Sequence, residues 1–100
     1  MANSAVRAIV RVKKTPMRAI MDTGANVSII TLLVVKKLHI IMGLLDRSKI
    51  IAINQIKKNV ISIVRDTPIS IQDARVSVNL LVINALENNL LLGIDWMDYY

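Results

Sequence analysis

The triplet Asp22-Thr23-Gly24 is the part of this 100-residue sequence whose residue types and spacing most directly indicate chemistry. It follows an apolar segment, and a carboxylate there is costly to bury unless hydrogen bonds satisfy its oxygens. The next residues supply the means, because the Gly24 amide can approach the carboxylate without a Cβ in the way, and Ala25 leaves space for a substrate backbone. The same triplet also occurs in ordinary turns led by aspartate, so alone it is only suggestive.

The cysteine and histidine content excludes several classes of catalytic site. Cysteine is absent and His39 is the single histidine, so we expect no disulfide framework, no thiolate zinc site and no histidine-based metal site. A serine nucleophile would need His39 as its base, and nothing around His39 resembles an element of a catalytic triad. We expect neither a metal nor another cofactor.

The net charge of +6 raises a nucleic-acid hypothesis, which the distribution of the charges weakens. The basic residues never run beyond pairs, and the aromatic residues crowd the C-terminal end instead of alternating with cations as a single-strand binder requires. No apolar run reaches the roughly 18 residues of a membrane helix, because Lys36 and Lys37 interrupt the longest one. We expect a soluble, intracellular protein without a nucleic-acid partner, a secretory signal or a membrane span.

Alternation of apolar residues predicts that the chain opens with a β-hairpin. Residues 5–12 alternate with period two, residues 13–16 form a polar break with a proline, and residues 17–21 resume an extended pattern that ends at Asp22. Small and polar residues at 22–26 then predict a turn. The hairpin thus delivers the acidic triplet at the end of a strand.

The apolar run after this turn allows two structures. Ser28 or Thr31 is suited to cap a short helix that ends at about Leu38, with Lys36 and Lys37 in its last turn, where cations suit the helix dipole. A strand over the same branched residues is the open alternative.

The second half of the chain predicts further strands and one short helix. Segments 50–53 and 60–64 are rich in β-branched residues and flank a polar tip at 54–59, which indicates a projecting hairpin. Residues 66–68 predict a turn, and residues 75–83 alternate as a strand does. The last part predicts a strand at residues 90–92, then Gly93, and a helix over residues 94–97 with Asp95 as a cap or first-turn acid.

Two motifs together resemble one known family. Asp22 to Ile29 (DTGANVSI) with Leu90 to Met97 (LLLGIDWM) resembles the retropepsin-like aspartic proteases of retroviruses and retroelements, in order and in spacing. The resemblance covers most of the chain and implies an all-β fold: a closed retropepsin-like (acid protease) barrel with one or two short helices. It further implies a single domain over residues 1–100 that dimerises, so that two DTG turns meet at the symmetry axis.

The resemblance also implies roles for individual residues. Asp22 matches the catalytic aspartate, and Gly93 matches the glycine that packs behind the active-site loop. The other residues of that loop are implied to contact the partner loop or the substrate: Thr23, Gly24, Ala25 and Asn26. The flap, which is the hairpin that covers bound substrate, is implied to include Ile53, Asn54 and Gln55.

The expected function is that of a homodimeric aspartic endopeptidase that cleaves extended polypeptide within a retroelement polyprotein. The number of motifs agrees with a dimer, because the mechanism needs two carboxylates and the chain has one D-[ST]-G triplet. The predicted flap lacks the glycine that the family usually carries near its tip. A catalytically impaired domain that acts as a peptide-binding or assembly module is therefore the alternative.

Overall fold

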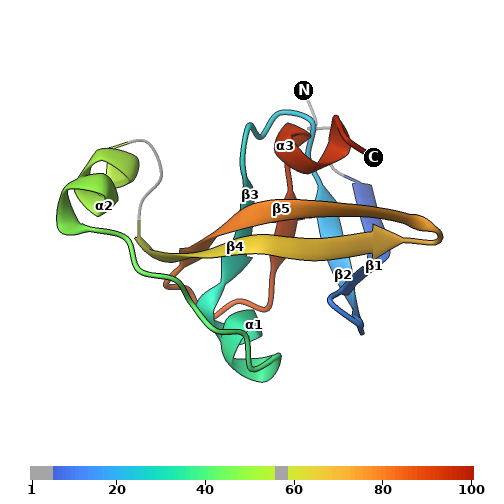
Figure 1. Ribbon diagram of the computed structural model, residues 1–100, viewed down its shortest axis with the longest axis horizontal. Helices are drawn as coiled ribbons and strands as arrows, with labels where there is room; N and C mark the ends of the chain where they lie inside the picture. The colour runs from blue at the N-terminus through green and yellow to red at the C-terminus, as the bar shows by residue number, and fades with distance from the viewer. Residues whose placement is uncertain (1–5, 56–58) are drawn as a thin grey trace.

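The computed structural model describes residues 6–55 and 59–100, whose strands close into a barrel (Figure 1). Around the barrel the strand order is β1-β2-β6-β3-β5-β4, and β4 pairs back to β1. The strands are β1 (Val6–Val12), β2 (Thr15–Met21), β3 (Ser28–Thr31), β4 (Val60–Ile71), β5 (Ala74–Ile83) and β6 (Leu90–Leu92). The helices are α1 (Leu32–Lys37), α2 (Arg47–Asn54) and α3 (Ile94–Met97).

The closed all-β barrel predicted from the resemblance is confirmed. Within the described ranges it carries three short helices, one more than expected. None of these helices is long and apolar enough to cross a membrane.

The opening hairpin forms as predicted. β1 and β2 pair antiparallel from Val6 with Met21 to Val12 with Thr15, around a two-residue turn. One face of β1 enters the core at Val10 and Val12, while Val6 on the same face is 61% exposed. The period-two pattern therefore identified the strand, and the barrel buries only its second half.

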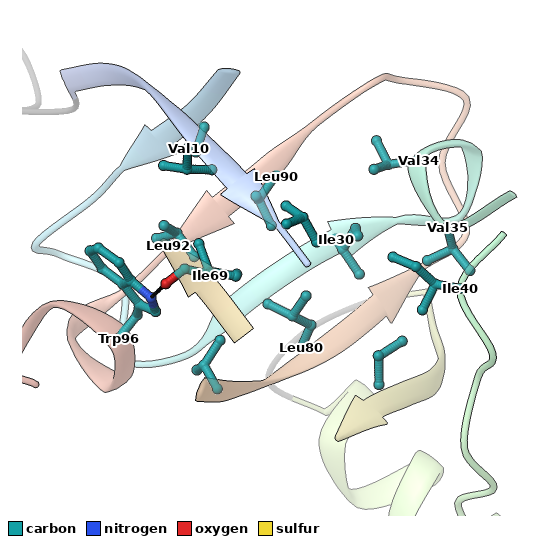
Figure 2. Packing of buried hydrophobic residues seen from close by; sticks show 14 of the residues in the cluster. Val10, Ile30, Val34, Val35, Ile40, Ile69, Leu80, Leu90, Leu92 and Trp96 are labelled. Atoms are coloured by element: carbon teal, nitrogen blue, oxygen red, sulfur yellow. Dashed lines mark hydrogen bonds between the residues drawn. The ribbon is translucent and has the colours of Figure 1, made fainter. Parts of the chain in front are cut away.

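The core is aliphatic with one aromatic residue, Trp96, at one end. Ile30, Ile69, Leu80 and Leu90 are all fully buried, and Figure 2 shows them converging from different strands. The Trp96 indole Nε1–H donates a hydrogen bond of 3.3 Å to the carbonyl of Ile69 (Figure 2), so the one polar atom of the ring is satisfied. This contact ties α3 to the far wall of the barrel.

The apolar run after the turn contains both structures that the sequence allowed. Its first four residues form β3, and helix α1 follows with Lys36 and Lys37 in its last turn. Thr31 occupies the N-cap position without capping through its side chain. Its hydroxyl instead donates to the carbonyl of Glu87 at 2.5 Å, which holds the loop before β6 against β3.

The hairpin predicted over residues 50–64 is wrong, because residues 47–54 form helix α2, while its predicted second arm, residues 60–64, is extended and begins β4. Asp46 is its N-cap: the carboxylate accepts the Lys49 N–H at 2.8 Å and the Ser48 hydroxyl at 2.7 Å. At the other end, the Asn54 side chain accepts from the Val60 N–H at 2.8 Å and so joins α2 to β4. Residues 56–58 of the expected tip lie outside the described residues.

The turn predicted at residues 66–68 is also wrong, because β4 continues through it to Ile71. The pairing of β4 with β5 shifts register between Val64 and Thr67, which marks a β-bulge. Asp66 adopts a positive φ of 52°, and its N–H donates to the Asn79 side chain on β5 at 2.9 Å. The residues that predicted a turn therefore form a β-bulge within a continuous strand.

Candidate active site

The loop that carries Asp22 is held by a single strand at both of its ends. β6 lies between β2 and β3, pairing parallel with β2 (Ile20 with Leu91) and antiparallel with β3 (Ile29 with Leu91). Since the loop leaves β2 and enters β3, the same short strand fixes its start and its finish. Figure 1 shows this loop at the upper end of the barrel, beside α3.

Three hydrogen bonds fix the backbone and carboxylate of Asp22. Its N–H donates to the Leu92 carbonyl at 3.0 Å, and its own carbonyl accepts the Ala25 N–H at 3.1 Å. Its carboxylate oxygen Oδ1 accepts the Gly24 N–H at 2.9 Å. A Cβ atom at Gly24 would lie 3.2 Å from that oxygen, so glycine permits the close approach that the sequence suggested.

Exposure differs sharply along this loop. Asp22 is half-buried and Ala25 is buried, while Thr23, Gly24 and Asn26 are exposed. The five residues are therefore brought together on one loop, and Thr23, Gly24 and Asn26 form its exposed part. This surface is accessible to a second molecule.

Gly93 packs directly behind the loop. A Cβ atom at this position would lie 2.6 Å from the Ala25 carbonyl oxygen and 2.9 Å from that of Val27, closer than real Cβ contacts come. The next residue, Ile94, donates its N–H to the Ala25 carbonyl at 2.9 Å. The junction of β6 and α3 is therefore a close-fitting support for the Asp22 loop, and only glycine fits there without movement of the backbone.

Ser28 and Asp95 complete this support, and the sequence analysis missed their pairing. The fully buried Ser28 donates its hydroxyl to Asp95 Oδ1 at 2.6 Å and its N–H to Asp95 Oδ2 at 3.0 Å. The same hydroxyl oxygen accepts the Gly93 N–H at 3.0 Å. Asp95 is in the first turn of α3, as predicted. The available signal was a lone serine inside an apolar run, which needs a polar partner when buried.

The structure does not bring the expected flap residues to this loop. Ile53 and Asn54 close α2, and Gln55 is its C-cap. The main packing partner of α2 is β4, and Figure 1 shows this helix set apart from the loop between β2 and β3. The candidate site of one chain thus consists of the Asp22 loop and its support.

The chain was compared with curated proteins and with solved structures. No curated protein matches the chain. Among solved structures, a crystal structure of the retroviral protease-like domain of Ddi1 from Leishmania major is similar, with a TM-score of 0.69 and 18% sequence identity. The alignment covers 95% of this chain and 74% of that one, and at this identity it shows a shared fold.

The family comparison covers the whole sequence. The model of the family described as retroviral aspartyl protease matches residues 1–100, which include the Asp22 loop and the Gly93 support. The barrel, the loop geometry and this match agree, and the chain belongs to the retroviral aspartyl protease family.

Proposed function

We propose that the chain is one subunit of a homodimeric aspartic endopeptidase, in which Asp22 from each of two copies forms the catalytic pair. The observation that carries the proposal is the Asp22 loop, in which residue Asp22 is half-buried while Thr23 and Gly24 beside it are exposed. One copy supplies one such carboxylate. Hydrolysis by acid–base catalysis needs one group that removes a proton and another that donates one, so a second copy completes the site.

In the proposed dimer the two carboxylates share a single proton, since both cannot ionise cheaply at close range. The ionised one removes a proton from a water molecule, which attacks the peptide carbonyl, and the protonated one donates to the carbonyl oxygen. Aspartic proteases are the established example of this arrangement. The hydrogen bond from the Gly24 N–H to Asp22 Oδ1 orients the carboxylate for this work.

The remaining loop residues position the substrate and the partner in this proposal. Thr23 joins the two loops across the symmetry axis, and Gly24, Ala25 and Asn26 contact the substrate main chain. Their location on one surface loop at the end of β2 supports these roles. The substrate is an extended polypeptide, and a retroelement polyprotein is the source that the family suggests.

We assign the cover of the substrate to the end of α2, at Ile53, Asn54 and Gln55. Helix α2 has no buried residue, and Ile51 is 55% exposed, so its apolar side chains are available for a substrate or a second copy. This role requires α2 to approach the Asp22 loop when substrate binds.

The variant Asp22→Asn tests the proposal. It keeps the shape of the side chain, so fold and dimer remain, while peptide turnover falls by at least about 10²–10⁴-fold, the usual contribution of an acid–base group. The assay is cleavage of a peptide library across pH, with activity expected to favour mildly acidic pH, beside a mass measurement of the oligomer. Asp73→Asn, at an exposed position between β4 and β5, is the matched control and retains activity. Unchanged cleavage by Asp22→Asn refutes the assignment.

A peptide-binding module without catalysis is the second candidate. The observation that favours it is helix α2, which occupies the segment where the family resemblance implied a flap hairpin. Binding of library peptides without turnover by the unmodified chain would establish this second function in place of the first.

A further inference from the structure

A groove lies at the end of the barrel opposite the Asp22 loop. It consists of two adjoining hollows, of about 360 and 410 Å³, which share Thr15 and Leu38 as walls. One hollow reaches Arg75 on β5, and the other reaches Arg18 on β2 and Lys37 on α1. Figure 1 shows the turn of β1 and β2 and helix α1 at the lower end of the molecule, away from the loop between β2 and β3 at the top. We call these two hollows the basic groove.

The charges that line the basic groove have a single sign. Its cationic lining residues come from four elements or turns and are Lys13, Lys14, Arg18, Lys37 and Arg75. No Asp or Glu is among the described residues that line it, although the chain has 7 acids against 13 Lys and Arg. A cleft lined by one sign of charge focuses the electrostatic field and attracts the opposite charge. The ligand that complements this groove is therefore anionic.

The uncharged surface of the groove indicates which kind of anion fits. Leu38, Ile40 and Pro68 supply aliphatic contact, and no aromatic residue is among the described lining residues. Single-stranded nucleic acids are usually held by aromatic rings on which the bases stack. Aliphatic walls instead match aliphatic side chains, which favours an acidic polypeptide over a nucleic acid.

An open strand edge borders the groove and provides a third feature. β2 pairs with β1 along its whole length, but in the described part of the chain it pairs with β6 only at Ile20 and Met21. The edge of residues 15–18 is therefore unpaired on the side of the second hollow, which these residues line. An extended peptide can add to such an edge through main-chain hydrogen bonds. Pro16 lacks an N–H, which limits the addition to a short segment.

We propose that the basic groove binds a short, extended, acidic segment of a polypeptide. The carboxylates of the segment lie against the five cations, its aliphatic side chains contact Leu38 and Ile40, and its backbone adds to the open edge of β2. Because the groove is remote from Asp22, this binding does not depend on catalysis.

The test uses a short, fluorescently labelled peptide in which Glu and Leu alternate. Its binding is measured to the full chain carrying Asp22→Asn, which cannot cleave the peptide if the proposed function holds. The Glu peptide is expected to bind about tenfold or more tightly than the same peptide with Gln in place of Glu, and its affinity falls with added salt. The double variant Lys14→Glu/Lys37→Glu loses this difference. Arg7→Glu/Arg65→Glu, at exposed positions on β1 and β4 that line neither hollow, changes the net charge equally and retains it.

Several results overturn the proposal. Equal affinity for the Glu and Gln peptides removes the charge argument, and full binding by the Lys14→Glu/Lys37→Glu variant places the peptide elsewhere. Tighter binding of a single-stranded oligonucleotide of equal charge, lost in the same double variant, assigns the groove to nucleic acid instead. Replacement of alternate peptide residues by proline weakens binding if the backbone adds to β2, and unchanged binding rejects strand addition. None of these results alters the cleavage test of Asp22.

Discussion

Replacement of Gly93 by alanine tests whether the junction of β6 and α3 supports the Asp22 loop. The new Cβ would lie 2.6 Å from the Ala25 carbonyl oxygen, 2.9 Å from that of Val27 and 3.0 Å from the Val27 carbonyl carbon. All three are backbone atoms, so no side-chain rotation relieves the contact and the loop itself must move. Gly93 has φ −96°, which alanine also adopts, so the cost is steric and not conformational.

The expected loss of stability follows from these contacts. Overpacking in a closely packed site costs about 1–3 kcal/mol, and the lower entropy of the unfolded alanine chain offsets about 0.4–1 kcal/mol of this. We expect a net loss of about 1–2 kcal/mol, which lowers the urea midpoint by about 0.5–1 M for a typical small domain. Both proteins must be compared at one concentration, because formation of the proposed dimer would contribute to apparent stability.

Two other glycines provide matched controls. At Gly24 the nearest atom to a new Cβ is the Asp22 side-chain oxygen at 3.2 Å, and at Gly43 it is the flexible Arg65 guanidinium at 2.8 Å, with the Ile63 carbonyl at 3.1 Å. The loss of stability is therefore expected to decrease from Gly93→Ala to Gly43→Ala to Gly24→Ala. Peptide cleavage should fall more in Gly93→Ala than the fraction unfolded explains. An unchanged urea midpoint for Gly93→Ala, or a larger loss for Gly24→Ala, would refute the steric reasoning.

Three further predictions concern the contacts around the barrel. Ser28→Ala removes the hydroxyl that joins the Gly93 N–H to Asp95 and should cost about 1–3 kcal/mol in urea unfolding, because buried polar groups lose their partner. Asp95→Asn should lower stability less than Ser28→Ala. A larger loss for Asp95→Asn would contradict the role assigned to the hydroxyl. Two hydrogen bonds lower the pKa of Asp46 below its ordinary value of 3.8, and the one from the Lys49 N–H has a larger effect than the one from the Ser48 hydroxyl. The cap of α2 is therefore complete above pH 3.8 and is lost as the pH falls through the lowered pKa. An NMR titration of the Lys49 amide should have its midpoint below pH 3.8. Trp96→Phe leaves the Ile69 carbonyl without its donor and should cost about 1–3 kcal/mol in urea unfolding, whereas Trp96→Ala also loses the packing of the ring and should cost about 3–5 kcal/mol. An unchanged stability of Trp96→Phe would reject the assigned hydrogen bond.

Sequence reasoning succeeded where local pattern and tertiary structure agree. The alternation before Asp22 predicted the β1–β2 hairpin, and the Gly93 motif predicted a strand followed by a helix. The turn at residues 22–26 follows from small and polar residues that cannot continue a buried strand. The closed barrel came from the family resemblance, since strand order is not readable from periodicity.

The two errors have different physical origins. The start signal of helix α2 was present, since Asp46 is a favourable N-cap. The helix was missed because the branched residues after Asp46 fit a strand equally well. At Asp66 a local signal for a turn was present, but the strand continues through it as a bulge, because the Asp66 N–H is satisfied by Asn79 on the neighbouring strand. The first error was a choice between competing local patterns, and the second needed knowledge of strand pairing.

The site was predictable as a loop and not as a network. Asp22, Gly24 and Gly93 were selected from the two motifs, and the contacts of the glycines are those expected of close approach. The pairing of Ser28 with Asp95 joins residues 67 positions apart and depends on the placement of β6 between β2 and β3. A lone serine in an apolar run indicates that a polar partner is needed, but it does not identify Asp95 as that partner.

The position of β6 sets an order of events during synthesis. A ribosome makes the Asp22 loop before the strand that holds both of its ends, which is complete only when Leu92 has been added. Until then the Asp22 N–H and the Ala25 carbonyl lack their native partners, Leu92 and Ile94. The loop therefore gains its native support only after the chain has been synthesised through Ile94, so the order of the strands delays formation of the candidate site.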